Sequence, residues 1–380
     1  MIASTPRGGL VGLALMAAAL ATCLPVPRAA AARKPTEKAR KPPVSVKAVV
    51  DFQSIYDDNI FRFSDENLLA YRRGESPWKF GMDTYDDLIL SPRFTVDLGR
   101  KLLGSKETAL RMKYTLWQYA SNPNKTNSQW FVRLRQPMRG KDALELSYTY
   151  APPAYIRQLS DRPPFVSRAV PLVWLKFKGT RNAFGLAYSA RLSDRLSCRF
   201  DGGRVLRYYN KPFLENDQWE WNAAGTATVK VASRWSVAGK YQYANAKSRA
   251  LDTVGETPLT SDDGDGSAER DLYQAAIVFA PKGRWKISEI SIMAQTMAYY
   301  YTTQRPYFED PTHTGRKDDV SAVEATLATR PVYGPVTLEF GYRHSTRSSS
   351  SAATDVGADA IEEDKNYSNN RVWLGMSWPL

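Results

Sequence analysis

From residue 44 to its end, the chain repeats one pattern of apolar and polar residues, about ten residues at a time, with turn-forming residues between the repeats. In one such stretch, Phe94, Val96 and Leu98 alternate with Thr95 and Asp97. Alternation with a period of two places the two sets of side chains on opposite faces of a β-strand. About fifteen stretches of this kind can be counted, so the pattern predicts an all-β protein.

The connections between these stretches tend to alternate in length, which a soluble sandwich does not require. A transmembrane β-barrel requires it, because its periplasmic turns are short and its outer loops long. The sequence therefore predicts a single transmembrane antiparallel up-and-down β-barrel over residues 44–380. The short connections are 139–142, 232–234 and 281–283, and the long ones are 120–127, 151–166, 245–270, 302–318 and 346–367.

Two successive connections, 178–182 and 192–195, both resemble tight turns, and this breaks the up-and-down order. Because bacterial single-chain barrels have an even number of strands, the count of about fifteen is off by one. We predict sixteen strands, with a poorly alternating piece near residues 154–159 as the missing one. Fourteen is the alternative.

Aromatic residues reinforce the membrane interpretation. The chain has 21 Tyr and 10 Trp, and many stand at the ends of the alternating stretches, for example Trp219, Trp221, Tyr241 and Tyr243. Amphipathic rings at both ends of an apolar band form the two interfacial girdles of a membrane barrel. The alternative is a water-soluble sandwich or barrel whose aromatic residues fill a core.

In the last fifteen residues, 366–380, Val372, Leu374, Met376, Trp378 and Leu380 fall on one face, so we expect the chain to end on a strand. This strand resembles the terminal signal of bacterial outer-membrane β-barrels, in which a glycine is followed at the third and fifth positions by aromatic or apolar residues. Gly375, Trp378 and Leu380 occupy those positions, although Pro379 departs from the family pattern. The resemblance implies that the barrel assembly machinery recognises this strand and that the barrel closes on it.

Residues 1–32 have the parts of an export signal: Arg7, an apolar run at 10–20 and small residues at 29–32. The run is too short to span a bilayer, so we expect a cleaved signal peptide and an outer-membrane location. Cys23 offers a lipoprotein signal as the alternative, but the preceding threonine disfavours that processing. Residues 33–43 are basic and almost free of apolar side chains, which predicts a disordered leader.

The formal net charge is +13, and in the predicted strands the cations lie opposite the apolar face. Charge on a lipid-facing surface costs about 2–4 kcal/mol near the midplane, so these side chains are expected to face the lumen. Fewer acids than cations occupy the positions expected to face the lumen, which predicts an anion-attracting pore. The alternative is that these charges pair across strands, or that they crowd the lumen until it is closed. The lumen cations are Arg93, Arg111, Lys113, Arg133, Arg135, Lys176, Lys178, Arg191, Lys230, Arg343 and Arg371, with Arg199 and Lys240 in the same phase.

Residues 54–62 and 86–92 resemble the opening of a poorly characterised group of β-barrel porins, some of them encoded with exopolysaccharide export systems. The resemblance implies a passive pore or a polysaccharide-associated outer-membrane channel. Asp57, Asp58 and Asn59 belong to this motif. We expect them to form a solvated strand-to-loop transition with Asx turns and not a binding site.

Two other functional classes are considered. An outer-membrane hydrolase needs a histidine near a carboxylate or hydroxyl group, and only His313 and His344 are available. Ser345 points away from its neighbour His344, so we favour a protein that is not an enzyme. A non-conducting accessory or anchor barrel of a polysaccharide secretion system is the other alternative.

No cysteine or histidine cluster and no glycine-rich phosphate loop is found in the sequence, so no cofactor or metal is predicted. The expected partners are outer-membrane lipid and lipopolysaccharide, the assembly machinery and polysaccharide export components. Nucleic acid is not expected, because the cations are scattered over separate strands of an exported chain.

Overall fold

The computed structural model describes residues 44–380 with the exception of residues 76, 103–105, 139, 162–172, 251–263, 283–285, 307–309, 311 and 352–363. The predicted signal peptide at 1–32 and the predicted basic leader at 33–43 lie outside the described residues.

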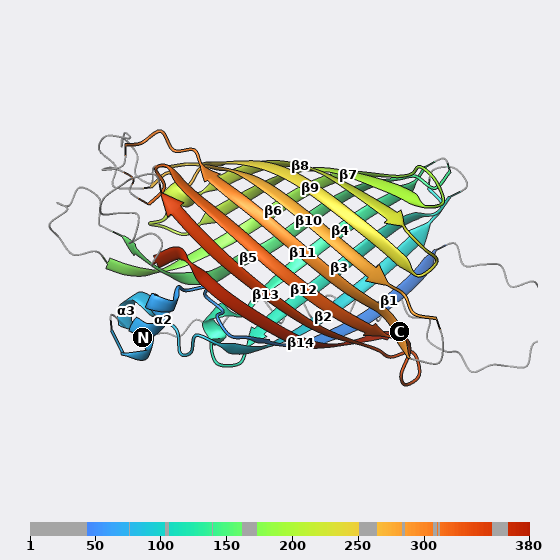
Figure 1. Cartoon of the computed structure of the whole chain (residues 1–380), viewed down its shortest axis with the longest axis horizontal. Coiled ribbons are helices and arrows are strands. Elements are labelled where there is room, and N and C mark those ends of the chain that lie inside the picture. Colours follow the sequence, from blue (N-terminus) through green and yellow to red (C-terminus); the bar gives the residue numbers. More distant parts are fainter. Residues whose placement is uncertain are drawn as a thin grey trace, which may run out of the picture. The chain divides into compact units, whose positions relative to one another are not determined.

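The described part of the chain forms fourteen strands in one closed antiparallel barrel, in which each strand pairs with its neighbours in sequence and β1 pairs with β14 (Figure 1). The strands are β1 (Ser45–Asp57), β2 (Asp87–Arg100), β3 (Thr108–Tyr119), β4 (Asn127–Pro137), β5 (Ala143–Asp161), β6 (Val173–Arg191), β7 (Leu196–Tyr209), β8 (Gln218–Lys230), β9 (Trp235–Ser248), β10 (Ala268–Phe279), β11 (Ile287–Tyr301), β12 (Arg316–Thr329), β13 (Thr337–Ser351) and β14 (Tyr367–Pro379).

Short helices lie only in connections of the described chain: α2 (Asp65–Arg72), α3 (Pro77–Phe80), η1 (Pro123–Lys125) and η2 (Leu214–Asn216). Ser64 caps α2 by accepting a hydrogen bond from the backbone N–H of Asn67, which satisfies one of the free donors of the first turn. None of the described helices combines the length and the apolar character that crossing a membrane demands.

The predicted barrel is confirmed, but the expected number of strands, sixteen, is wrong and the alternative of fourteen is right. Residues 178–182 are not a turn; they lie inside β6, which runs for 19 residues. The piece at 154–159 is not a separate strand either, because it continues β5, also 19 residues long, past two bulges. Merging the two halves of β6 removes the surplus strand and restores the up-and-down order.

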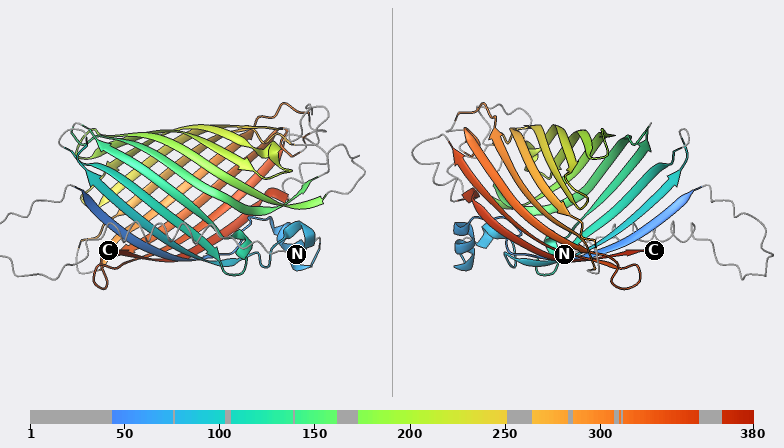
Figure 2. Two further views of the ribbon diagram at one scale, coloured as in Figure 1. Left: turned by 180° about the vertical axis from the view of Figure 1, so that it is seen from behind. Right: turned by 45° about the vertical axis from the view of Figure 1, so that its right-hand side comes forward.

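The connections sort by length onto the two ends of the barrel. The start of β1, the end of β14 and the short turns after β2, β4, β6, β8, β10 and β12 lie at one end, which we call the short-turn end. The remaining connections lie at the other end, the long-loop end; they include those with α2, α3 and η1, and all except the one with η1 are longer than every short turn. The two orientations in Figure 2 show the strands running between these ends.

The outer face of the barrel carries large apolar side chains that are open to the surroundings. Leu146 is 52% exposed, Phe200 60% and Trp221 59%, and their neighbours in sequence point inward. Apolar surface costs about 25 cal/mol per Å² in water, so a continuous band of it requires lipid. Exposed aromatic rings such as those of Phe200 and Trp221 belong to this outer band of the closed barrel, so the alternative of a soluble sandwich is wrong.

The barrel closes where β1 meets β14, along nine paired positions from Val49–Pro379 to Asp57–Arg371. The predicted C-terminal strand is therefore confirmed. Trp378 and Leu380 point outward at the short-turn end, 51% and 73% exposed. Gly375 faces inward, where a Cβ would lie 3.4 Å from the Gln53 side chain.

Asp57 stands at the long-loop end of this seam and is fully buried. Its carboxylate accepts hydrogen bonds from Arg371 Nε at 2.5 Å, Asn369 Nδ2 at 2.6 Å and the Asn59 backbone N–H at 3.1 Å. The last of these is the predicted Asx turn. The prediction that this transition is solvated is wrong, because the carboxylate is needed to satisfy donors from both ends of the chain.

Candidate functional site

The register of the strands decides which charged side chains face the lumen. On β3 and β4, Arg111 and Arg133 alternate with the outward Met112 and Val132, and the two arginines are paired across the strands. Seven of the predicted lumen cations take the inward phase within the barrel wall. They are Arg93, Arg111, Lys113, Arg133, Arg135, Arg343 and Arg371.

Two more predicted cations, Arg191 and Lys230, share the inward phase but stand at the short-turn end, where both are exposed. The guanidinium of Arg191 donates to the Ser193 carbonyl oxygen at 3.2 Å and to the Asp194 carboxylate at 3.1 Å, both in the adjoining turn. These two cations therefore border the pore entrance and do not line its middle.

Lys176 and Lys178 do not face the lumen. They share the phase of Phe184 and Leu186 on the outer side of β6, while Phe177 points inward and stacks on the Tyr209 ring with a centroid separation of 4.6 Å. Residues 173–179 pair with the part of β5 that follows its first bulge, toward the long-loop end. At this end of β6 no lipid contact requires apolar side chains to face outward. Phe177 therefore points inward, and the lysines on either side of it point outward.

Much of the inward charge is paired. Arg111 makes two hydrogen bonds to Asp97, at 2.6 and 2.8 Å, in the side-by-side geometry that arginine and carboxylate prefer. Glu145 of β5 is the common partner of three arginines, Arg135 at 3.1 Å and Arg133 at 3.8 Å on the adjacent β4, and Arg199 at 2.8 Å on β7, two strands away. The alternative of cross-strand pairing is thus correct for this part of the wall.

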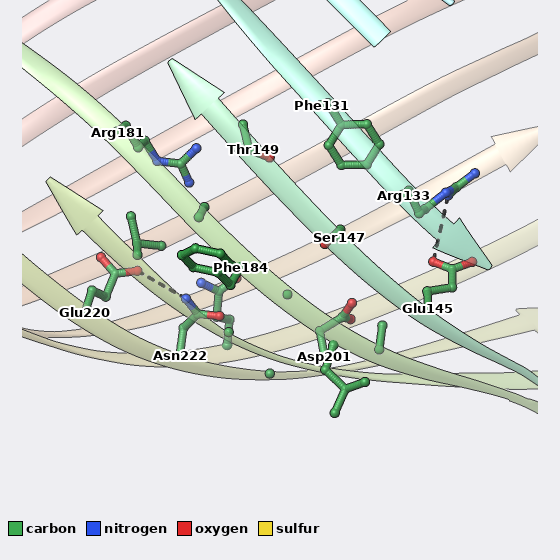
Figure 3. Close-up of a pocket in the computed structure, with 18 of the residues that line it drawn as sticks. Phe131, Arg133, Glu145, Ser147, Thr149, Arg181, Phe184, Asp201, Glu220 and Asn222 are labelled. Atoms are coloured by element: carbon green, nitrogen blue, oxygen red, sulfur yellow. Dashed lines mark hydrogen bonds and ion pairs between the residues drawn. The ribbon is translucent and has the colours of Figure 1, made fainter. Parts of the chain in front are cut away.

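A hollow of about 450 Å³ lies along the inner face of β4 to β10 and is lined by five arginines and three carboxylates (Figure 3). Glu220, nearly buried, pairs with Arg270 at 2.8 Å and Arg207 at 3.1 Å. Arg181 reaches into the same hollow from β6. These three arginines were missed in the sequence because one lay in the supposed turn and the other two lay beyond the alternating stretches counted.

Several inward cations, among them Arg93, Lys113 and Arg181, make no ion pair within the described residues. Arg93 has a buried Nε without a hydrogen-bond partner there, and Lys113 lies 5.3 Å from the centroid of the Phe131 ring. Arg181 lies inside the hollow just described. The described inner wall therefore keeps a positive excess after its carboxylates are paired.

At the long-loop end of the lumen, the part of β5 around Tyr155 and Arg157 packs across the opening. Tyr155 of β5 donates a hydrogen bond from its hydroxyl to the Gly81 carbonyl oxygen at 3.2 Å, next to α3, and packs edge-on against Phe61. Beside it, Arg157 lines one pocket with Met297 of β11 and Val320 of β12. Since β5 and β12 lie on opposite sides of a fourteen-strand barrel, this part of β5 reaches across the opening.

That pocket, which we call the mouth pocket, has a volume of about 500 Å³. It combines cationic and aromatic side chains from both ends of the chain. Its lining side chains include Phe61, Arg62, Tyr119, Lys125, Tyr155, Arg157, Tyr299, Arg347, Asp364, Lys365, Tyr367 and Arg371.

Neither histidine is arranged for hydrolysis. His313 contacts Asp310 at 2.8 Å and the Thr312 hydroxyl at 3.1 Å, but through the same ring nitrogen, Nδ1. A catalytic relay needs the carboxylate on one ring nitrogen and the nucleophile on the other. His344 Nδ1 contacts the Asn370 side-chain oxygen at 2.9 Å, and Ser345 is buried on the opposite face.

A closed up-and-down barrel with an apolar outer band and a polar, charged inner wall has the architecture of a transmembrane β-barrel. No protein-family model and no curated protein sequence matches the chain. Among solved structures, the outer membrane channel DcaP of Acinetobacter baumannii is similar at 12% identity and a TM-score of 0.46, covering 89% of this chain and 97% of that one.

Two further structures show the same level of likeness. A bacterial polysaccharide outer membrane secretin has 10% identity and a TM-score of 0.40, covering 88% of this chain and 98% of its own. OmpT, an outer membrane protein of Vibrio cholerae, has 10% identity and a TM-score of 0.46, covering 91% and 100%.

Proposed function

We propose that this chain is an outer-membrane channel through which small anions and acidic sugar-type solutes diffuse. The observation that supports it best is the excess of inward cations over their paired carboxylates, with Arg93, Lys113 and Arg181 left without an ion pair in the described wall. A wall of low dielectric constant concentrates the field of these charges in the lumen, which attracts anions and repels cations.

The proposed orientation follows from the loops. The short-turn end, which holds both ends of the barrel chain, faces the periplasm after export and signal cleavage, and the long-loop end faces outward. Lys176 and Lys178 then stand on the outer surface beside the phosphorylated headgroups of lipopolysaccharide. Assembly would proceed through recognition of Gly375, Trp378 and Leu380 on β14.

A second candidate is a non-conducting accessory barrel of a polysaccharide secretion system. The observation in its favour is the far part of β5, which packs beside α3 and lines the mouth pocket together with β11 and β12, and so narrows the long-loop end. Under this proposal the inner charges would serve to hold the wall together and no solute would pass.

Liposome swelling separates the two proposals. We would fold the full mature chain into liposomes and follow the swelling rate in isotonic solutions of glucose and of glucuronate, which have similar size but differ in charge. Faster entry of glucuronate supports the anion-preferring channel. Entry of glucose at an equal or higher rate refutes the preference, and swelling no faster than in empty liposomes refutes the channel and favours the accessory barrel.

A further inference from the structure

The mouth pocket gathers six cations from five separate parts of the chain. Arg62 follows β1, Lys125 ends η1, Arg157 belongs to β5, Arg347 to β13, and Lys365 and Arg371 to the segment around the start of β14. Among its described lining residues, Asp364 is the one acid. So many like charges around a common space require an explanation, because unit charges about 6 Å apart repel by roughly 0.7 kcal/mol even in water and by more inside a protein.

Three of the six cations are balanced. Arg371 lies 2.5 Å from Asp57, Arg347 lies 2.5 Å from Asp318, and Lys365 lies 2.5 Å from Asp364. These pairs use the carboxylates that the described residues place next to the pocket.

The other three, Arg62, Lys125 and Arg157, make no ion pair within the described residues. The ammonium group of Lys125 donates a hydrogen bond to the Ile156 carbonyl oxygen at 3.0 Å and lies 4.1 Å from the centroid of the Phe61 ring. The Arg62 guanidinium lies over the Tyr367 ring at 5.8 Å. Ring faces and a carbonyl oxygen stabilise a cation only in part, so the pocket keeps a positive excess.

Burial, and then the charge of Arg157, lower the pKa of Lys125 to about 7. Asp57 opposes that shift, while Arg62 and Arg371 add to it. Lys125 is thus placed where its charge depends on what else occupies the pocket, since a bound anion would restore the charged form.

We infer that the mouth pocket is a binding site for an anionic sugar, a monosaccharide-sized ring bearing a carboxylate or phosphate, held between Arg62, Lys125 and Arg157. The uncompensated cations supply the recognition of the acid group through charge-assisted hydrogen bonds. The rings of Tyr119, Tyr299 and Tyr367 supply flat walls with polar tips for the rest of the molecule.

The size of the pocket agrees with this class of ligand. A volume of about 500 Å³ falls within the range of pockets that enclose small molecules, and it has room for one sugar ring with ordered water. The inferred site deepens the proposed channel function. It rests on that proposal, because solute must enter from the long-loop end to reach the mouth pocket. A channel with such a site would take up dilute solute more effectively than an unspecific pore.

Binding can be measured on the folded full mature chain in detergent, without any membrane. We would titrate glucuronate into the protein by calorimetry at pH 6 and low salt, with glucose as the neutral probe of matched shape. Glucuronate should bind saturably and glucose should not. Replacing Arg157→Gln or Lys125→Met should each weaken glucuronate binding about tenfold or more, the loss expected when a charge-assisted contact is removed.

Arg204→Gln is the matched control, because it removes an arginine from the outer face, where its guanidinium lies over Trp221. If Arg157→Gln prevents folding, Arg62→Gln provides the same test at an exposed position. Absence of saturable binding, equal binding of glucose, or affinity unchanged in the pocket variants would each overturn the inference.

A pH series tests the role of Lys125 separately. Glucuronate stays ionised from pH 6 to 8.5, while Lys125 loses its proton as the pH rises through its lowered pKa. Affinity should therefore fall over this interval, and the fall should disappear in Lys125→Met. An anion-selective current without saturable binding would refute only this site, whereas binding without any current would refute the channel and leave the site intact.

Discussion

Removing one unpaired charge from the inner wall should change ion selectivity by an amount that can be worked out. Arg181 reaches into the lumen hollow and makes no ion pair in the described wall. A monovalent ion passing at about 6 Å interacts with it by roughly 0.7 kcal/mol in water, reduced to about 0.4 kcal/mol in 0.1 M salt. An energy of about 0.4 kcal/mol makes the passage of an anion about twofold faster when Arg181 is present, and the passage of a cation about twofold slower.

Arg181→Gln should therefore lower the anion-to-cation permeability ratio about fourfold at 0.1 M salt, and by more at lower ionic strength. The assay is the zero-current potential of single channels in a planar bilayer under a salt gradient. Arg204→Gln removes the same charge from the outer face and should leave the ratio unchanged. An unaltered ratio in Arg181→Gln, or an equal change in both variants, would refute the assignment of Arg181 to the conducting lumen.

Three further outcomes are expected. Gly341→Ala should destabilise the barrel by about 1–3 kcal/mol, because its Cβ would lie 2.0 Å from the Trp373 ring, whereas Gly239→Ala meets nothing within 4 Å; equal urea midpoints would contradict this. Asp57→Ala should cost about 1–3 kcal/mol by leaving buried donors unpaired at the seam, and an unshifted midpoint would show that the seam does not depend on it. Glu145→Gln should raise the anion preference, because Arg133 and Arg135 lose their carboxylate partner while Arg199 keeps its ion pair with Asp201; a fall in the zero-current potential would oppose that view.

The barrel itself was predictable because the bilayer imposes one rule on every strand that crosses it: apolar side chains face the lipid, and the alternate, polar side chains face the lumen. Alternation in 88–98 and 366–380 follows from that rule, and the structure places both stretches in β2 and β14. Inward placement of Arg111 and Arg133 followed for the same reason, since a charge facing lipid is costly.

The rule fails where strands extend beyond the band. Residues 154–161 and 173–179 still pair as strands, but bulges and loop contacts decide their phase, so 178–182 resembled a turn and Lys176 was assigned to the wrong face. A search for alternation extended through 179–191 and 200–208 would have recovered a longer β6 and the inward phase of Arg181 and Arg207.

The mouth pocket was beyond any local pattern. Arg62, Lys125 and Arg157 are far apart in the sequence, and no periodicity links them. They meet because the far part of β5 reaches across the opening and packs against the segment after β1. Only the three-dimensional structure brings such contacts together.

The most direct test of the channel proposal is the zero-current potential of the unmodified barrel. Residues 33–380 would be folded in detergent, checked for β-structure by circular dichroism and inserted into a planar bilayer under a tenfold gradient of potassium chloride. The proposal predicts stable openings with a zero-current potential of the sign set by chloride. A cation-directed potential would contradict the anion preference, and a folded barrel that never opens would contradict the channel itself.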